Sequence, residues 1–212
     1  MTGADWLSYK QSIGDCTELF SSIADLIRPS RVLYLGSYVD LSPSMVWPGV
    51  TYVDVDKRAK KFFSDEALVA QQLQNRIYRP QTPEARFVHG DFNSDLPLPQ
   101  NSFDLVISLY SGPSLEAALR YLAPNGVLLT NNSHADSSLA IVSGILKPLA
   151  VVLYGSGKYS IKADDLDEYF ENPESHFSKN DLMSDYLMID DDRDTQIVVE
   201  EELCPKVYYQ TY

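Results

Sequence analysis

The sequence predicts an α/β fold, a Rossmann-like, doubly wound and mostly parallel sheet. From residue 31 to residue 155, short apolar runs rich in β-branched residues alternate with segments of helical composition. Such runs are typical of strands that are buried on both faces. Strands that alternate with helices imply right-handed crossovers and therefore parallel pairing. We expect the final residues, 207–212, to add an antiparallel edge strand.

The first predicted element is an amphipathic helix that leads into the sheet. Asp15 and Glu18 have the spacing of a capping box, and apolar residues then recur at helical intervals until Pro29. The run RVLYLG at 31–36 is the first strand. Ser42 and Pro43 then predict the start of a short helix that ends near residue 47.

The later elements continue this alternation. Further strands are predicted at 50–56, 85–89, 103–110, 127–132 and 149–155, and further helices at 57–77, 115–122 and 137–146, with a turn at 123–126. Residues 156–206 have the least regular pattern, and we expect an insertion with a short helix at 164–170. The prediction is one domain, with a helical lead at 1–30, a core sheet at 31–155, the acidic insertion, and the edge strand at 207–212.

The acidic charge is concentrated in one segment. The formal net charge is −13, and residues 164–202 contain 15 acidic and 2 basic side chains, whereas residues 1–163 contain 15 and 14. A negative field repels phosphate backbones, so nucleic acid is not an expected partner. We expect this segment to be a solvated loop, and the alternative is a lid or a docking surface for a cationic substrate or a basic protein.

Targeting and metal signals are absent from the sequence. The first residues contain no basic stretch followed by an apolar run, and nothing approaches the roughly 18 apolar residues of a membrane span. Cys16 and Cys204 lie far apart without the spacing of metal ligands, which suits a reducing compartment. We therefore expect a cytoplasmic protein without a membrane partner or a bound metal, and the sequence predicts no particular oligomeric state.

Polar residues and glycine stand where several predicted strands end. Ligands of open parallel sheets bind beyond these carboxyl ends, near the point where the strand order reverses. Gly36 supplies a tight turn, and Asp54, with Asp56 as second choice, is placed to accept hydrogen bonds from both hydroxyls of a ribose. Asp91 is placed to accept from an exocyclic amine while Phe92 covers a base. Together these residues predict a cleft for a nucleoside-type ligand.

The order of these motifs resembles a known family. The runs VLYLG, VTYVDVD, FVHGDFNSDLPLPQNSFDLVIS and YLAPNGVLL are similar, in that order, to the class I S-adenosylmethionine-dependent methyltransferases. The resemblance covers residues 31–132. It implies S-adenosylmethionine as cofactor, with Gly36 near its methionine portion, Asp54 on the ribose, Asp91 at the adenine amine and Phe92 beside the adenine ring.

The first loop departs from that family's pattern. The family has an acidic residue two positions before the first glycine and two further glycines after it, whereas this chain has Tyr34 and then Gly36-Ser37-Tyr38-Val39-Asp40. Tyr38 crowds a path that bare backbone normally leaves open. Asp40 either contacts the amino group of the cofactor or begins the next helix. The loop therefore binds the cofactor in a shifted pose, binds a different ligand, or binds none.

Three residues near later strand ends are further candidates for the site. The family places substrate-facing residues at the position of Ser108 and Tyr110, and we assign Ser108 to the cofactor pocket and Tyr110 to the reaction. His134 follows the fifth strand of this pattern and is a candidate general base. Methyl transfer needs no protein nucleophile, because the sulfonium is already activated.

Three functions remain open from the sequence. The first is methyl transfer to a small molecule or a protein side chain. The second is a non-catalytic interaction protein that keeps the methyltransferase fold without its cofactor, and the third is aminopropyl transfer to a polyamine.

Overall fold

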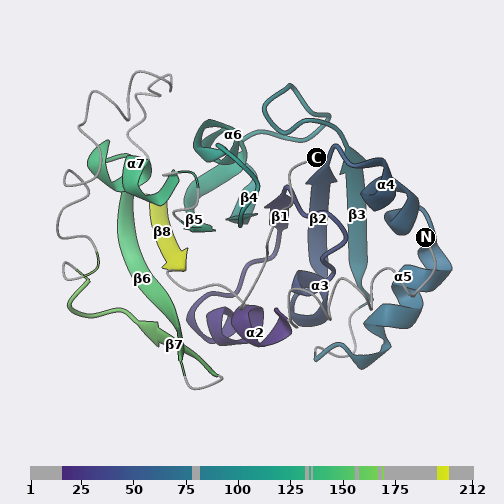
Figure 1. The fold of residues 1–212 in the computed structure, drawn as a ribbon, viewed down its shortest axis with the longest axis horizontal. Coiled ribbons are helices and arrows are strands. Elements are labelled where there is room, and N and C mark those ends of the chain that lie inside the picture. Colours follow the sequence, from purple (N-terminus) through teal and green to yellow (C-terminus); the bar gives the residue numbers. More distant parts are fainter. Residues whose placement is uncertain are drawn as a thin grey trace.

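A single mixed sheet forms the centre of the structure, which is a computed structural model (Figure 1). It describes residues 16–77, 82–131, 134, 136–155, 158–166, 169 and 195–200. Within these residues the sheet has eight strands in the order β3-β2-β1-β4-β5-β8-β6-β7. The strands are β1 (Val32–Leu35), β2 (Gly49–Asp54), β3 (Glu84–His89), β4 (Phe103–Ser108), β5 (Leu122–Asn131), β6 (Leu146–Gly155), β7 (Lys158–Lys162) and β8 (Thr195–Glu200).

Strand pairing confirms the predicted mostly parallel, doubly wound sheet. Every neighbouring pair from β3 to β6 is parallel, and β7 alone pairs antiparallel, with β6. The strand order reverses between β1 and β4, which is the topological switch point. The antiparallel edge is therefore made by β7, and the edge strand expected at 207–212 lies outside the described residues.

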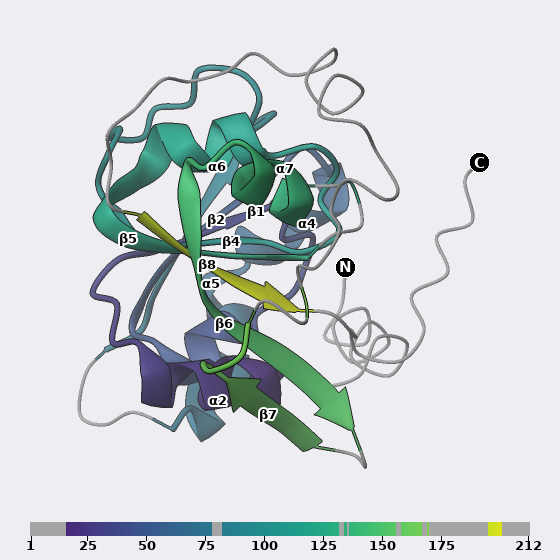
Figure 2. The same ribbon diagram turned by 90° about the vertical axis from the view of Figure 1, so that its left-hand side faces the viewer.

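Helices cover both faces of the sheet, as Figure 2 shows for α6 and α7 above it and α2 below it. The α2 face has α2 (Thr17–Leu26), α3 (Pro43–Val46), α4 (Lys57–Phe63), α5 (Glu66–Gln72) and the 3-10 turn η1 (Leu73–Asn75), and the opposite face has α6 (Leu115–Tyr121) and α7 (Asp136–Val142). Two separate apolar clusters result, one on each face. No helix in the described part of the chain is long and apolar enough to cross a membrane.

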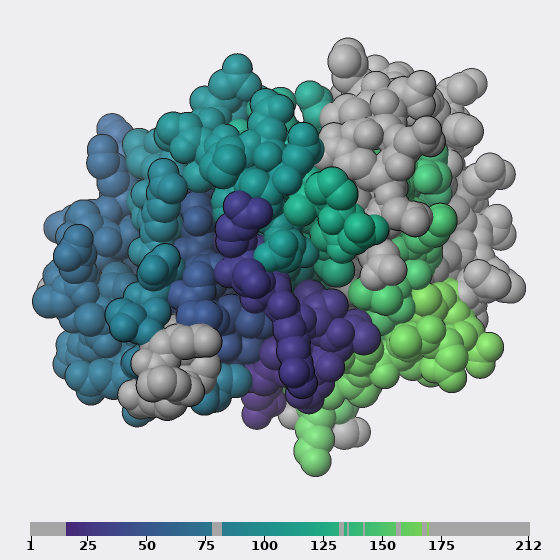
Figure 3. Space-filling model, turned by 180° about the vertical axis from the view of Figure 1, so that it is seen from behind, coloured from purple at the N-terminus to yellow at the C-terminus, as the bar shows by residue number. Residues whose placement is uncertain are grey.

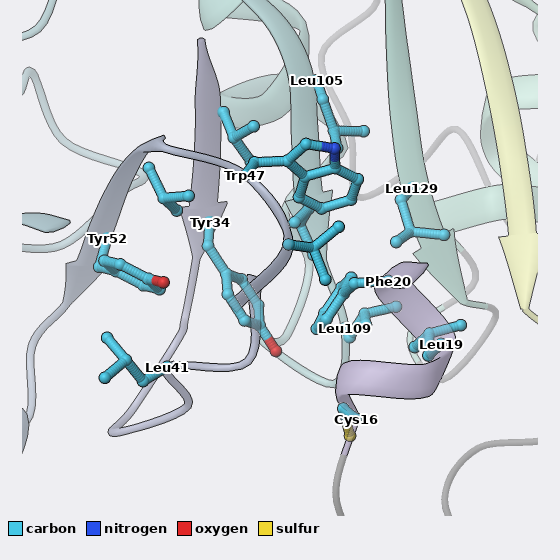
Figure 4. Packing of buried hydrophobic residues seen from close by; sticks show 14 of the residues in the cluster. Cys16, Leu19, Phe20, Tyr34, Leu41, Trp47, Tyr52, Leu105, Leu109 and Leu129 are labelled. Carbon is cyan, nitrogen blue, oxygen red and sulfur yellow. The ribbon is translucent and has the colours of Figure 1, made fainter. Parts of the chain in front are cut away.

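The core on the α2 face is rich in aromatic rings. Figure 4 shows Tyr34 of β1 between Phe20 of α2 and Tyr52 of β2, and its ring centroid lies 6.3 Å from each of theirs. Trp47 packs edge-on against Phe20 at 5.9 Å. β7 also contributes to this cluster, through Tyr159. In Figure 3 the purple surface of α2 accordingly lies beside the light green surface of β7.

Several sequence predictions are corrected by the structure. Residues 123–126, predicted as a turn, are part of β5. The single helix expected at 57–77 is broken, because the carboxylate of Asp65 accepts a hydrogen bond from the Leu68 amide and starts α5 as a new helix. Residues 195–200, which the sequence assigned to an insertion, form β8 between β5 and β6. Asp15 of the predicted capping box lies outside the described residues. The short helix predicted at 164–170 lies partly outside them.

A buried hydroxyl links β2 to α3 and supplies a test of the core. The Tyr52 hydroxyl lies 2.6 Å from Ser44 Oγ and accepts from the Ser44 amide at 3.1 Å. Tyr52→Phe removes this hydroxyl from a fully buried position, so the free energy of unfolding should fall by about 1–3 kcal/mol in urea denaturation. Tyr154→Phe is the matched control, because that hydroxyl has no hydrogen bond within the described residues, and it should change stability by less than about 0.5 kcal/mol. Equal losses in both variants would contradict the assignment.

Candidate functional site

The loop after β1 is fastened to β2 and to the segment after β4. The amides of Gly36 and Ser37 both donate to the Val53 carbonyl, at 2.9 and 3.3 Å. Gly36 has a φ of +65°, and a Cβ added there would clash with Ser111 Cβ. Gly36 therefore supplies the predicted turn, and the space where its side chain would be is taken by Ser111.

Asp54 joins this loop to the end of β2. One carboxylate oxygen, Oδ2, accepts from the Tyr38 amide at 2.7 Å, and the other, Oδ1, accepts from the Asp56 amide at 2.7 Å. The residue is only 9% exposed. Buried carboxylates need such partners. These bonds hold Asp54 at the carboxyl end of the sheet and fix the loop after β1 and the segment after β2 around it.

An ion pair and an aromatic ring close the outer side of this loop. The Asp56 carboxylate accepts from Arg58 at both Nε and Nη2, with the shortest distance 2.6 Å, and the guanidinium carbon lies 5.0 Å from the centroid of the Tyr38 ring. The hydrogen bond from Arg58 lowers the pKa of Asp56. Asp56 also caps α4 by accepting from the Arg58 amide. Tyr38 adopts a φ of +45°, which is rare for a bulky side chain.

Asp40 is buried in the loop before α3. It is 2% exposed, and its carboxylate accepts from the Ser42 amide at 2.9 Å and from the Tyr34 hydroxyl at 3.4 Å. These contacts support the start of α3. The structure therefore does not bring Asp40 to the open edge of the candidate site.

Asp91 and Phe92 lie beyond the end of β3. The Gly90 amide donates to the Asp54 carbonyl at 3.1 Å, so the ends of β2 and β3 are adjacent. Asp91 is exposed and accepts from the Asn93 amide at 2.9 Å, which makes an Asx turn. Phe92 is half-buried against the cluster on the α6 face. Contacts of these two residues with an adenine remain predictions.

A chain of hydroxyl groups follows β4. Ser108 Oγ lies 2.6 Å from Ser111 Oγ and also bonds to Ser114 Oγ, which donates to the Asp136 carboxylate at 2.8 Å. The amides of Ser114 and Leu115 donate to the same carboxylate. Ser108 therefore belongs to a buried network that runs from the loop after β4 to the start of α7.

Asp136 is the functional candidate that sequence reasoning missed. It is 3% exposed, and burial raises the pKa of its carboxyl although hydrogen bonds from Ser114 and Leu115 oppose the shift. Its partners are 21 and 22 positions away in the chain. The only local signal is an acidic residue in the first turn of a predicted helix.

The two predicted acceptor-side residues flank this network. The Tyr110 amide donates to Asn131 Oδ1 at 3.4 Å, and Tyr110 has a φ of +53°. His134 is exposed, and its electrostatic interaction with Asp136 opposes the rise in the pKa of that carboxyl. The described residues contain no group of three or more His, Cys, Asp or Glu side chains that could hold a metal ion.

Comparison with known proteins finds likenesses among solved structures only. No protein-family model matches this chain, and no curated protein matches it. A solved structure from Thermotoga maritima, described as a SAM-dependent methyltransferase and possible histamine N-methyltransferase, is 15% identical with a TM-score of 0.39. The match covers 59% of this chain and 55% of that chain, so this chain spans about half the length of that protein. The strand order and pairing, not this likeness, define the fold described above.

The contact of Gly36 with Ser111 predicts a position-specific loss of stability. Gly36→Ala combines a positive φ with a clash and should lower the free energy of unfolding by about 2–4 kcal/mol. Gly112→Ala is the control, because Gly112 has a φ of +92° but no atom within 4 Å of an added Cβ, and it should cost about 1–2 kcal/mol. Adding Ser111→Gly to Gly36→Ala should recover part of the difference. Equal costs at both glycines and no recovery would contradict the packing.

The raised pKa of Asp136 predicts a pH dependence of stability. Because the folded protein holds the Asp136 proton more tightly than the unfolded chain, this residue adds stability as the pH falls through its folded pKa and loses it as the pH rises. Asp136→Asn cannot titrate, so its cost relative to the wild type should shrink as the pH rises from about 4 to about 7 in urea denaturation. A cost that grows with pH would mean that the fold favours the ionised carboxylate.

Proposed function

We propose that this chain binds S-adenosylmethionine at the carboxyl ends of β1, β2 and β4 and transfers its methyl group to a small molecule or a protein side chain. The observation that carries the proposal is the position of Asp54. It is a carboxylate at the end of the second strand, beside the reversal of strand order between β1 and β4. Open α/β sheets bind ligands at this reversal, and an acidic residue at the end of the second strand accepts ribose hydroxyls.

The end of β2 fits a ribose. The Asp54 carboxylate offers about four acceptor positions, of which the Tyr38 and Asp56 amides use two, one on each oxygen. One acceptor position per oxygen is therefore left for the two ribose hydroxyls. Both oxygens are already held in place, so binding would not require the carboxylate to be ordered first.

The loop after β1 fits the methionine portion less well. Ser111 fills the space over Gly36, and Tyr38 stands where the family has bare backbone. The ring of Tyr38, with Arg58 against it, is thus part of the proposed pocket wall. On this proposal the cofactor binds in the shifted pose, one of the alternatives that the sequence left open.

When bound, the cofactor supplies an activated methyl group. The chain's own residues bind and orient the cofactor and the acceptor, and they exclude water. Tyr110, half-buried at the end of β4, is proposed to line the acceptor side. His134 is proposed to take a proton from an acceptor hydroxyl or amine. On the charge and cysteine arguments above, the proposal includes a cytoplasmic location and no nucleic acid partner.

A second candidate is a non-catalytic interaction protein that keeps this fold without the cofactor. The specific observation in its favour is the set of contacts that close the loop, namely Gly36 on Ser111 and Arg58 on Tyr38. The described residues contain no observation that favours aminopropyl transfer.

Calorimetric titration with S-adenosylmethionine and with S-adenosylhomocysteine tests the proposal. We expect saturable binding by the wild type, and a loss of affinity of about tenfold or more in Asp54→Asn, because one carboxylate oxygen becomes a donor. Asp65→Asn is the matched control, since Asp65 also accepts a backbone hydrogen bond but lies at α5, and its affinity should be unchanged. Absence of binding and of thermal stabilisation at about millimolar ligand would overturn the proposal.

Tyr38→Gly separates the two candidates. If the tyrosine contacts the cofactor, this variant should lose affinity in the same titration. If the wild type binds nothing and Tyr38→Gly gains binding, the side chain blocks a degenerate pocket and the second candidate is supported.

A further inference from the structure

A cavity lies at the opposite end of the sheet from Asp54. It has a volume of about 230 Å³ and is lined by the amino ends of β1, β2 and β3 and by the segment before β4. Its lining includes Arg31, Gly49, Thr51, Glu84 and Arg86. Nothing in the proposed function uses these residues.

The register of the strands explains the hollow. Gly49 lies beside Glu84, and Thr51 lies beside Leu33 on one side and Arg86 on the other. Because alternate residues of a strand share a face, these side chains and that of Arg31 point to one side of the sheet. Gly49 contributes no side chain in the middle of this row, and a Cβ there would lie only 3.0 Å from the Ser30 carbonyl oxygen. A larger residue at position 49 would therefore have to displace Ser30, which also lines the cavity.

The two arginines of the cavity have no charge partner in the described part of the chain. Arg31 and Arg86 are both exposed, and neither guanidinium makes a hydrogen bond or ion pair with another described residue. The nearby carboxylate of Asp104 is committed to the amides of Ser30 and Arg31, at 2.9 and 2.8 Å. By contrast, Arg58 and Arg120 are both paired with acidic side chains.

Positive charge prevails in the cavity. Its lining holds two guanidinium groups and the single carboxylate of Glu84, although residues 1–163 as a whole are nearly neutral, with 15 acidic and 14 basic side chains. Guanidinium groups recognise the oxygens of phosphates and carboxylates with paired N–H donors. The Thr51 hydroxyl adds a further donor on the cavity floor.

We propose that this cavity binds the oxyanion of a small ligand, a phosphate or a carboxylate, between Arg31 and Arg86. Glu84 limits the positive charge of the cavity and is expected to weaken anion binding. The site is at the amino ends of the strands, whereas the proposed nucleoside site is at their carboxyl ends, so either can fail without the other.

The test is an NMR titration of the full chain with inorganic phosphate and, separately, with acetate, up to about 10 mM at constant ionic strength, a range suited to millimolar affinity. We expect saturable shifts of the Arg31 and Arg86 Nε–H signals and of the Gly49 and Thr51 amides. Saturation by phosphate alone identifies a phosphate site, by acetate alone a carboxylate site, and by both a general oxyanion site.

Variants of the lining sharpen this test. Arg31→Gln and Arg86→Gln should each weaken binding about fivefold or more, and Glu84→Gln should tighten it about two- to fivefold, because a like charge is removed. Lys60→Gln removes one positive charge on exposed α4 and should leave the affinity unchanged. Non-saturable shifts, shifts centred elsewhere, or equal effects of Lys60→Gln and Arg31→Gln would overturn the proposal.

Discussion

The Asp54 carboxylate is the contact on which the carboxyl edge of the sheet depends. Its two oxygens accept amide hydrogens from opposite sides, from Tyr38 in the loop after β1 and from Asp56 before α4. Asp56 in turn caps α4 and binds the Arg58 guanidinium. A nearly buried carboxylate without hydrogen-bond partners would be costly. Asp54 therefore fixes the loop after β1, the segment after β2 and the start of α4.

A strained backbone residue lies on each side of the strand-order reversal. Tyr38 follows β1 and Tyr110 follows β4, and both have a positive φ that side chains of this size rarely adopt. Such conformations persist where surrounding contacts enforce them, and they cluster at ligand sites. Here the contacts are the Asp54 carboxylate and the Asn131 side chain. The hydrogen bonds of Asp54 hold the loop after β1 closed, and they also hold the two carboxylate oxygens at the edge of this loop. The closed loop favours a degenerate pocket, and the placed oxygens favour ribose binding and methyl transfer, so these remain the two candidates.

The sequence predicted elements whose causes are local. Apolar runs that alternate with helical segments predicted the strands. The position of Asp54 was predicted because a strand ends in this carboxylate. The break of the helix at Asp65 was missed, because a capping side chain inside a helical composition leaves no gap in the pattern. The network of Ser114 and Asp136 and the insertion of β8 between β5 and β6 depend on long-range contacts, which no local spacing encodes.

The two ends of the parallel strands differ in their charged groups, with Asp54, Asp56 and Arg58 at the carboxyl end and Arg31, Arg86 and Glu84 at the amino end. The central claim is that Asp54 receives the ribose of an adenosyl ligand. A crystal structure of the chain grown with S-adenosylhomocysteine tests it most directly. The account predicts both ribose hydroxyls within about 3 Å of the Asp54 oxygens. A nucleoside bound at another edge, or a carboxyl edge without ligand and with Ser111 still packed on Gly36, would contradict it.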